Sequence, residues 1–144
     1  MSFFDYSKVP TYYQVCFHEQ CPRSGECLRF LTAQHIPEKV VTGMAVYPTA
    51  CHNGQCEVFR SSEKVVLAWG FSQLYTPLKR YFHSIARNDV VTYFGSEGTY
   101  YRYYHGERKL SPAQQQDIAG ILKKDQYDGP LPFAHYEESY DFGV

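Results

Sequence analysis

The sequence predicts an α+β fold, in which a small metal-stabilised hairpin-and-loop module packs on a bundle of about four short helices. Two observations indicate this division. All five cysteines lie within residues 16–56, among turn-forming residues. Helical spacing of apolar residues begins only near Pro77. We therefore expect a cysteine-rich metal-binding module at 1–60, a helical region at 61–124 and an acidic aromatic tail at 125–144 packed on the body.

Composition limits the class of protein. The chain has 144 residues, of which 44% are hydrophobic, so it can bury a core. Its N-terminus lacks a basic segment followed by an apolar run, which argues against a signal peptide. No stretch approaches the roughly 18 apolar residues that a membrane-spanning helix requires. The sequence thus predicts a cytoplasmic protein that does not associate with a membrane. In the reducing cytoplasm, clustered cysteines are more plausible as metal ligands than as disulfides.

Charge is unevenly distributed along the chain. Residues 60–124 carry ten basic and five acidic side chains, whereas residues 125–144 carry five acidic and no basic ones. A basic segment attracts phosphate, and an acidic segment can dock on it or screen it. We expect Phe133, Tyr136 and Tyr140 of the tail to pack on the body, with the carboxylates near basic residues.

The cysteine spacing predicts a closed, structural zinc site. It is C-x4-C-x5-C, then 23 residues, then C-x4-C. Tetrahedral zinc takes four ligands, usually two from each of two turns. Turn signals occur at Cys21-Pro22, at Ser24-Gly25 and at His52-Asn53-Gly54. The predicted ligands are Cys16, Cys21, Cys27 and Cys56, with Cys51 as an alternate.

Two alternatives to zinc remain open. Thiolates also hold iron–sulfur clusters, near which a Cys-Pro step recurs, and buried free thiols can act as small hydrophobic side chains. His18 and His52 lie beside the cysteines and are candidate substitute ligands. Between the cysteine groups, Val40–Tyr47 is predicted to be a strand ended by Pro48, with Glu57–Arg60 as a candidate partner.

Four helices are expected in the second half. Apolar residues at i, i+3, i+4 and i+7 predict a helix over 77–87, and Asn88 or Asp89 is expected to cap a second one through Phe94. Ser96 is a cap for a third over 97–104. The fourth begins after Ser111, followed by Pro112 and by Gln114 to complete a capping box, and ends near Lys124.

Residues 78–124 resemble helix-turn-helix domains of the phage-repressor type. The resemblance depends on the Phe94-Gly95-Ser96 turn, the aromatic helix 97–104 and the Leu110-Ser111-Pro112 helix start. It implies that the helix after the turn enters the major groove of DNA, with one carboxylate, Glu97, at its start. The residues that the resemblance assigns to the groove or to phosphate are Thr99, Arg102, Tyr103, His105, Arg108 and Lys109.

Nearly the whole chain also resembles a family of short, uncharacterised, cysteine-containing proteins of gut anaerobes, a domain of unknown function. The resemblance contributes to the choice of Cys56 over Cys51 and implies no activity. Its matching segments are Asp5–Pro10, Cys21-Pro22, Cys27-Leu28-Arg29, Cys56 with Phe59-Arg60, Tyr100-Tyr101-Arg102, Gly106-Glu107-Arg108 and Leu110-Ser111-Pro112.

These patterns favour a small zinc-stabilised regulator that binds double-stranded DNA. One alternative is a protein-docking module, whose many tyrosines contact a partner chain. Another is an iron–sulfur electron carrier. The sequence contains no nucleophile elbow and no phosphate-binding glycine loop, and an enzyme is not expected.

Overall fold

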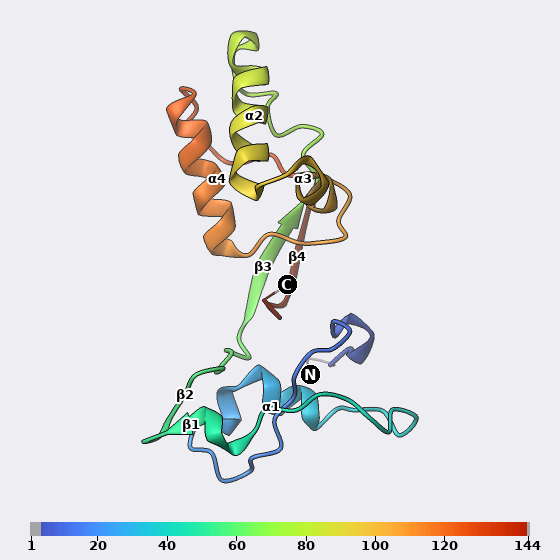
Figure 1. Cartoon of the computed structure of the whole chain (residues 1–144). Coiled ribbons are helices and arrows are strands. Elements are labelled where there is room, and N and C mark those ends of the chain that lie inside the picture. Colours follow the sequence, from blue (N-terminus) through green and yellow to red (C-terminus); the bar gives the residue numbers. More distant parts are fainter. Residues whose placement is uncertain (1–3, 144) are drawn as a thin grey trace. The chain divides into compact units, whose positions relative to one another are not determined.

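The described part of the chain forms four α-helices and two small antiparallel sheets, so the α+β prediction is confirmed. The structure is a computed structural model that describes residues 4–143. The chain divides into unit 1, Met1–Lys64 with Tyr140–Val144, and unit 2, Val65–Ser139. The elements, labelled in Figure 1 where there is room, are the 3-10 turns η1 (Tyr6–Lys8), η2 (Ser24–Glu26), η3 (Pro48–Ala50) and η4 (Arg80–Phe82), the helices α1 (Leu28–Ala33), α2 (His83–Phe94), α3 (Glu97–Tyr104) and α4 (Pro112–Lys124), and the strands β1 (Cys51–His52), β2 (Gln55–Cys56), β3 (Lys64–Trp69) and β4 (His135–Tyr140).

Helices α3 and α4 begin where their capping residues predict. The Ser96 hydroxyl accepts a hydrogen bond from the backbone N–H of Thr99 at the start of α3. Ser111 and Gln114 form the reciprocal capping box that starts α4. Among residues 4–143, no helix combines the length and apolar character needed to cross a membrane.

The predicted helix over 77–87 and the separate short helix after it are wrong. The chain instead forms the turn η4 and then one continuous helix, α2. Ala86 and Val90 lie one helical turn apart and are both fully buried, so the apolar face of the helix continues past the exposed residues Asn88 and Asp89. Core packing therefore overrides the capping preference of these two residues, and the helix continues to Gly95, whose φ of 84° ends it.

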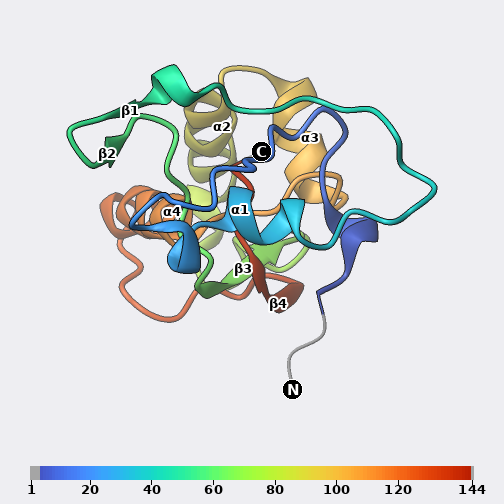
Figure 2. The same cartoon turned by 90° about the horizontal axis from the view of Figure 1, so that it is seen from below.

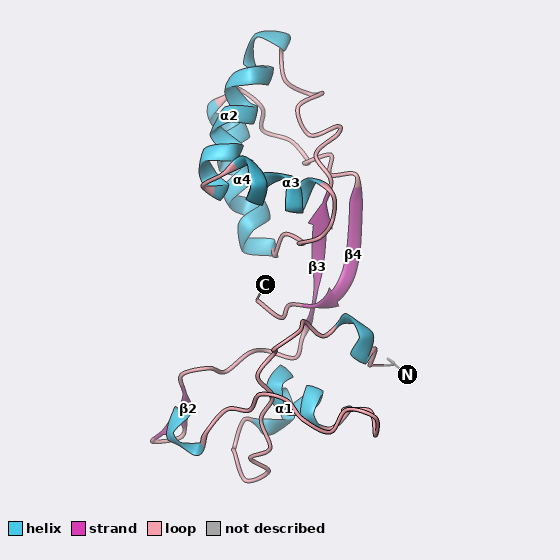
Figure 3. Cartoon of the chain, turned by 45° about the vertical axis from the view of Figure 1, so that its right-hand side comes forward, coloured by secondary structure: helices cyan, strands magenta, loops and turns pink. Residues whose placement is uncertain are grey.

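The core of unit 2 lies between its helices and the β3–β4 sheet. In Figures 1 and 3, α2 and α4 lie side by side, and the strands β3 and β4 pair along their length. Phe71 is at the centre of the core, with ring contacts to Tyr100 and Phe133 at centroid distances of 5.1 and 5.9 Å. Leu110 also joins this core, and its backbone exchanges hydrogen bonds with Ala68 of β3. Strand β3 was not predicted.

Unit 1 consists mainly of loops around the short helix α1, on which Leu28 and Thr32 are fully buried. The predicted strand over 40–47 is wrong. This segment is a loop with one isolated bridge, between Val15 and Ala45, and Figure 2 shows it as an extended tube. It lacks a partner strand because the turn at His52-Asn53-Gly54 pairs β1 with β2, instead of pairing Glu57–Arg60 with residues 40–47.

The acidic tail contributes to both units. Phe133 is buried in unit 2, and Glu137 accepts a 2.5 Å hydrogen bond from Lys109. In unit 1, Asp141 forms a 2.7 Å ion pair with Arg60, and Tyr140 contacts Phe4. Tyr136, by contrast, is 52% exposed, so only part of its surface is covered.

Candidate metal centre

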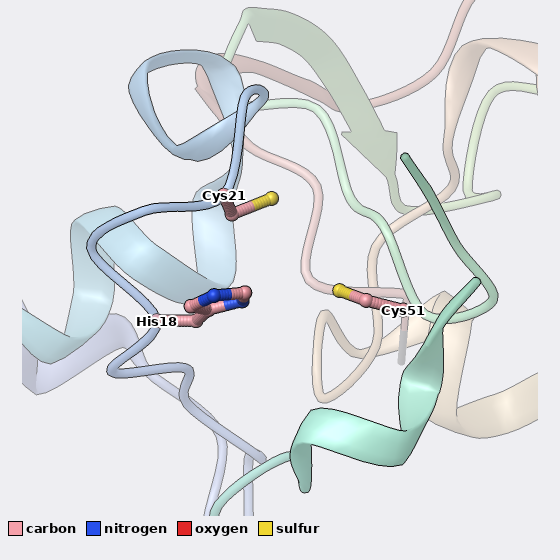
Figure 4. Close-up of side chains that lie close together, drawn as sticks. All are labelled: His18, Cys21 and Cys51. Carbon is pink, nitrogen blue, oxygen red and sulfur yellow. The ribbon is translucent and has the colours of Figure 1, made fainter. Parts of the chain in front are cut away.

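Three side chains of unit 1 bring metal-ligating atoms together. One ring nitrogen of His18 and the thiol sulfurs of Cys21 and Cys51 lie within 4.8 Å of one another. Figure 4 shows all three side chains directed toward one space, with His18 and Cys51 on opposite sides of it and Cys21 above. The two cysteines are half-buried, and the histidine is exposed. This spacing suits side chains that can close around one ion.

A local turn positions His18 and Cys21. The backbone N–H of Cys21 donates to the carbonyl of His18 at 3.2 Å. Two residues separate the pair, as in many zinc-binding loops, in which two ligands come from one tight turn. The next turn follows directly, since the Ser24 N–H donates to the Cys21 carbonyl at 3.0 Å. The loop before α1 therefore supplies two of the three candidate ligands.

A hairpin positions the third ligand. Cys51 begins β1 and lies directly opposite Cys56 of β2. The turn between the strands has positive φ at both central residues, 51° at Asn53 and 78° at Gly54. Those angles are typical of the type I′ turn, whose twist matches paired strands and fixes their register. An Asn-Gly turn thus fixes Cys51 in place.

The thiols of this group are close enough to affect one another. Burial raises the pKa of the Cys51 thiol, and a hydrogen bond and charge repulsion from Cys56, followed by similar effects from Cys21, raise it further. Without a cation, neighbouring thiolates repel. A divalent metal ion reverses this preference, because it stabilises thiolates that coordinate it.

All five cysteines line one cavity of about 320 Å³. Cys16, Cys27 and Cys56 contribute to its wall without belonging to the group of three. Cys27 is 9% exposed and precedes α1, and its backbone N–H donates to the Ser24 carbonyl. The remaining wall is mostly apolar and includes Phe17, Phe30, Val46 and Phe59.

Two of the five cysteines, Cys21 and Cys51, belong to this candidate group, and its third member is His18. Cys21 was predicted as a ligand, Cys51 only as an alternate, and His18 only as a substitute. The signal for Cys51 was present in the Asn53-Gly54 turn, which is a strong hairpin signal between two cysteines. The signal for His18 was its spacing from Cys21.

The predicted DNA-contacting residues are dispersed over different environments in unit 2. Tyr103 is 5% exposed and stacks on Phe94 at 4.6 Å, so it cannot reach a base edge. It lies inward because Tyr100 and Tyr103, three residues apart, form the apolar face of α3. Lys109 is paired with Glu137, and its ammonium lies 4.6 Å from the centre of the Trp69 ring.

The other predicted contacts lie at or near the surface. Arg102, His105 and Arg108 are exposed, and Thr99 is half-buried. Arg87 is a further cation of this unit. Its guanidinium donates a hydrogen bond to the Tyr101 hydroxyl and lies 3.5 Å from the carboxylate of Glu97. With Lys109 neutralised and Tyr103 buried, the geometry does not support DNA binding through α3.

Comparison with known proteins identifies a family. The sequence pattern of a protein family described as "Family of unknown function (DUF6078)" matches residues 1–142. No curated protein and no solved structure matches the sequence. The family match assigns no activity to the chain.

Proposed function

We propose, for a chain that belongs to the family of unknown function DUF6078, that unit 1 binds a zinc ion and that its fold depends on this ion. The observation that carries the proposal is the convergence of His18, Cys21 and Cys51 within 4.8 Å. Imidazole and thiolate are the ligands that zinc prefers among the common cellular metals. Carboxylates, which favour magnesium or calcium, are missing from the group.

Cys56 is the proposed fourth ligand. A structural zinc ion takes four ligands in tetrahedral geometry, and Cys56 lies opposite Cys51 in the hairpin and lines the same cavity. Burial and, after it, the neighbouring Cys56 thiol raise the pKa of the Cys51 thiol. The proposed set is therefore His18 and Cys21 from one turn and Cys51 and Cys56 from a second.

The small core of unit 1 supports a structural role for the ion. Its buried side chains among the described residues are Phe4, Val15, Cys27, Leu28 and Thr32. Small modules with so little buried apolar surface usually require disulfides or a metal to fold. Structural zinc supplies about 10–16 kcal/mol of apparent binding energy in small peptides, which is ample for such a module.

The test is elemental analysis of the purified full-length protein and of single-residue variants. We expect about one zinc per chain in the unmodified protein. His18→Ala, Cys21→Ser, Cys51→Ser and Cys56→Ser should each lower this value by more than half. Cys16→Ser is the matched control, because Cys16 lines the same cavity outside the proposed set and should keep full zinc.

Two results would overturn the proposal. Full zinc in Cys51→Ser together with loss in Cys16→Ser would favour the ligand set predicted from spacing, Cys16, Cys21, Cys27 and Cys56. Iron with visible absorbance after anaerobic purification would indicate a cluster in place of zinc. Helical circular dichroism of each variant shows whether unit 2 is still folded, so that loss of zinc is not mistaken for general unfolding.

A further inference from the structure

Cys51 and Cys56 have the backbone geometry of a cross-strand disulfide. The next pair along the hairpin is hydrogen-bonded, since the N–H of Glu57 donates to the carbonyl of Ala50 at 3.1 Å. Because hydrogen-bonded and non-hydrogen-bonded pairs alternate, Cys51 and Cys56 form a non-hydrogen-bonded pair. Such residues have Cα atoms about 4.5 Å apart, a distance that a disulfide spans.

The hairpin also holds this geometry in the absence of a bond between the sulfurs. The turn at Asn53 and Gly54 fixes the register, so that the two cysteines do not need to search for each other. Both side chains are half-buried, which leaves them accessible to a small oxidant.

We propose that Cys51 and Cys56 are a site of reversible oxidation, at which a disulfide forms and withdraws two ligands from the metal centre. The pairing itself stands on the hairpin geometry alone. The effect on the metal rests on the proposed function, because it requires zinc to be bound by these cysteines. Oxidation would then release the ion, and reduction would restore the site.

The chemistry balances with a peroxide as oxidant. One thiolate attacks hydrogen peroxide, the O–O bond breaks, and a sulfenic acid and hydroxide form; a proton converts the hydroxide to water. The second thiol attacks the sulfenic sulfur, forms the S–S bond and releases a second water. Two electrons pass from the sulfurs to the peroxide. Starting from the zinc-bound thiolates, the products are the disulfide, free Zn²⁺ and two waters, with two protons consumed.

Trypsin digestion tests the pairing directly. Cleavage after Lys39 and Arg60 gives peptide 40–60, which contains Cys51 and Cys56 and no other cysteine. Cys16 and Cys21 fall together in peptide 9–23, and Cys27 falls in peptide 24–29. The full-length protein as purified is treated with equimolar hydrogen peroxide, alkylated with iodoacetamide, digested and analysed by mass spectrometry.

We expect peptide 40–60 to lose two hydrogens and to resist alkylation until dithiothreitol is added. The matched control, Cys16→Ser, should behave identically, because it leaves the hairpin unchanged. A doubly alkylated peptide 40–60, or one linked to peptide 9–23 or 24–29, would overturn the pairing.

A second measurement tests the effect on the metal. Zinc-loaded protein is oxidised in the same way, and released zinc is followed with a chromogenic chelator. Release in step with the disulfide, and rebinding after reduction, supports the proposal. A disulfide that forms while zinc stays bound would contradict the proposed release of the metal on oxidation. If the reduced protein binds no zinc at all, both the proposed zinc site and the proposed release of zinc are wrong. The peptide analysis still decides whether Cys51 and Cys56 form a disulfide.

Discussion

Tyrosine hydroxyls form specific hydrogen bonds inside unit 2. Tyr75 and Tyr100 share a hydrogen bond of 2.9 Å, and the Tyr93 hydroxyl donates to Asp117 at 2.7 Å. Burial raises the pKa of Tyr75 and, with the neighbouring carboxylate of Asp117, raises the pKa of Tyr93 to about 12. The many tyrosines of this chain therefore act partly as core residues with a polar end, which links helices through hydrogen bonds.

This arrangement predicts a stability change at alkaline pH. The pKa of Tyr93 is about 12 in the folded chain and about 10 in an unfolded one. The contribution of the Tyr93 hydroxyl to the free energy of unfolding is complete below pH ~10. It is lost as the pH rises to ~12, because the hydroxyl loses its proton in the unfolded state at a lower pH than in the folded state. Tyr93→Phe should flatten the fall in the free energy of unfolding over this range, measured by urea denaturation at several pH values. Tyr81→Phe is the control, since Tyr81 is 77% exposed in the same unit and should leave the slope unchanged.

At the scale of elements, two glycines end helices in similar conformations but different surroundings. Gly95 after α2 has a φ of 84°, and Gly106 beyond α3 has a φ of 80°. A Cβ at Gly95 would meet nothing within 4 Å, whereas one at Gly106 would lie 2.5 Å from the Trp69 indole. That ring is held by His135, which stacks on it at 5.0 Å.

Alanine at the two positions therefore separates backbone strain from steric overlap. We expect Gly95→Ala to lower the free energy of unfolding of unit 2 by about 1 kcal/mol, the cost of a left-handed conformation. Gly106→Ala should cost more, by about 1–3 kcal/mol in addition, because the indole has to move. Chemical denaturation followed by helical circular dichroism measures both. Equal losses in the free energy of unfolding at the two positions would show that the Trp69 indole moves without a measurable free-energy penalty.

At the scale of the whole molecule, the two units are stabilised differently. Unit 2 has a continuous apolar core that includes Phe71, Tyr100, Leu110 and Ile118. Unit 1 has few buried side chains and gathers all five cysteines around one cavity. Its proposed zinc ion would replace the missing core.

Chelation should therefore loosen one unit and leave the other. On removal of zinc with a strong chelator, we expect amide hydrogen exchange to accelerate at α1 and over Cys51–Cys56, because these segments lose their cross-link. Amides of α4 should keep their protection. Exchange in α1 that is equally slow with and without the chelator would contradict a structural role for the metal.

Local signals predicted elements with strong start or end residues. The capping residues Ser96 and Ser111 placed α3 and α4 correctly, because a cap depends on side chains within three residues of it. The strand over 40–47, predicted to end at Pro48, is a loop because its pairing is limited to one bridge, between Val15 and Ala45. The break at Asn88 failed because burial of Ala86 and Val90 outweighs a weak capping preference.

By itself, the sequence determined the α+β class, the caps of the last two helices and the grouping of the cysteines in one region, since each of these depends on residues close together in the chain. Only the tertiary structure decided that His18, Cys21 and Cys51 meet and that Tyr103 faces inward. These outcomes depend on how separate segments pack, because His18 and Cys51 lie far apart in sequence and the spacing of cysteines does not state which turns come together.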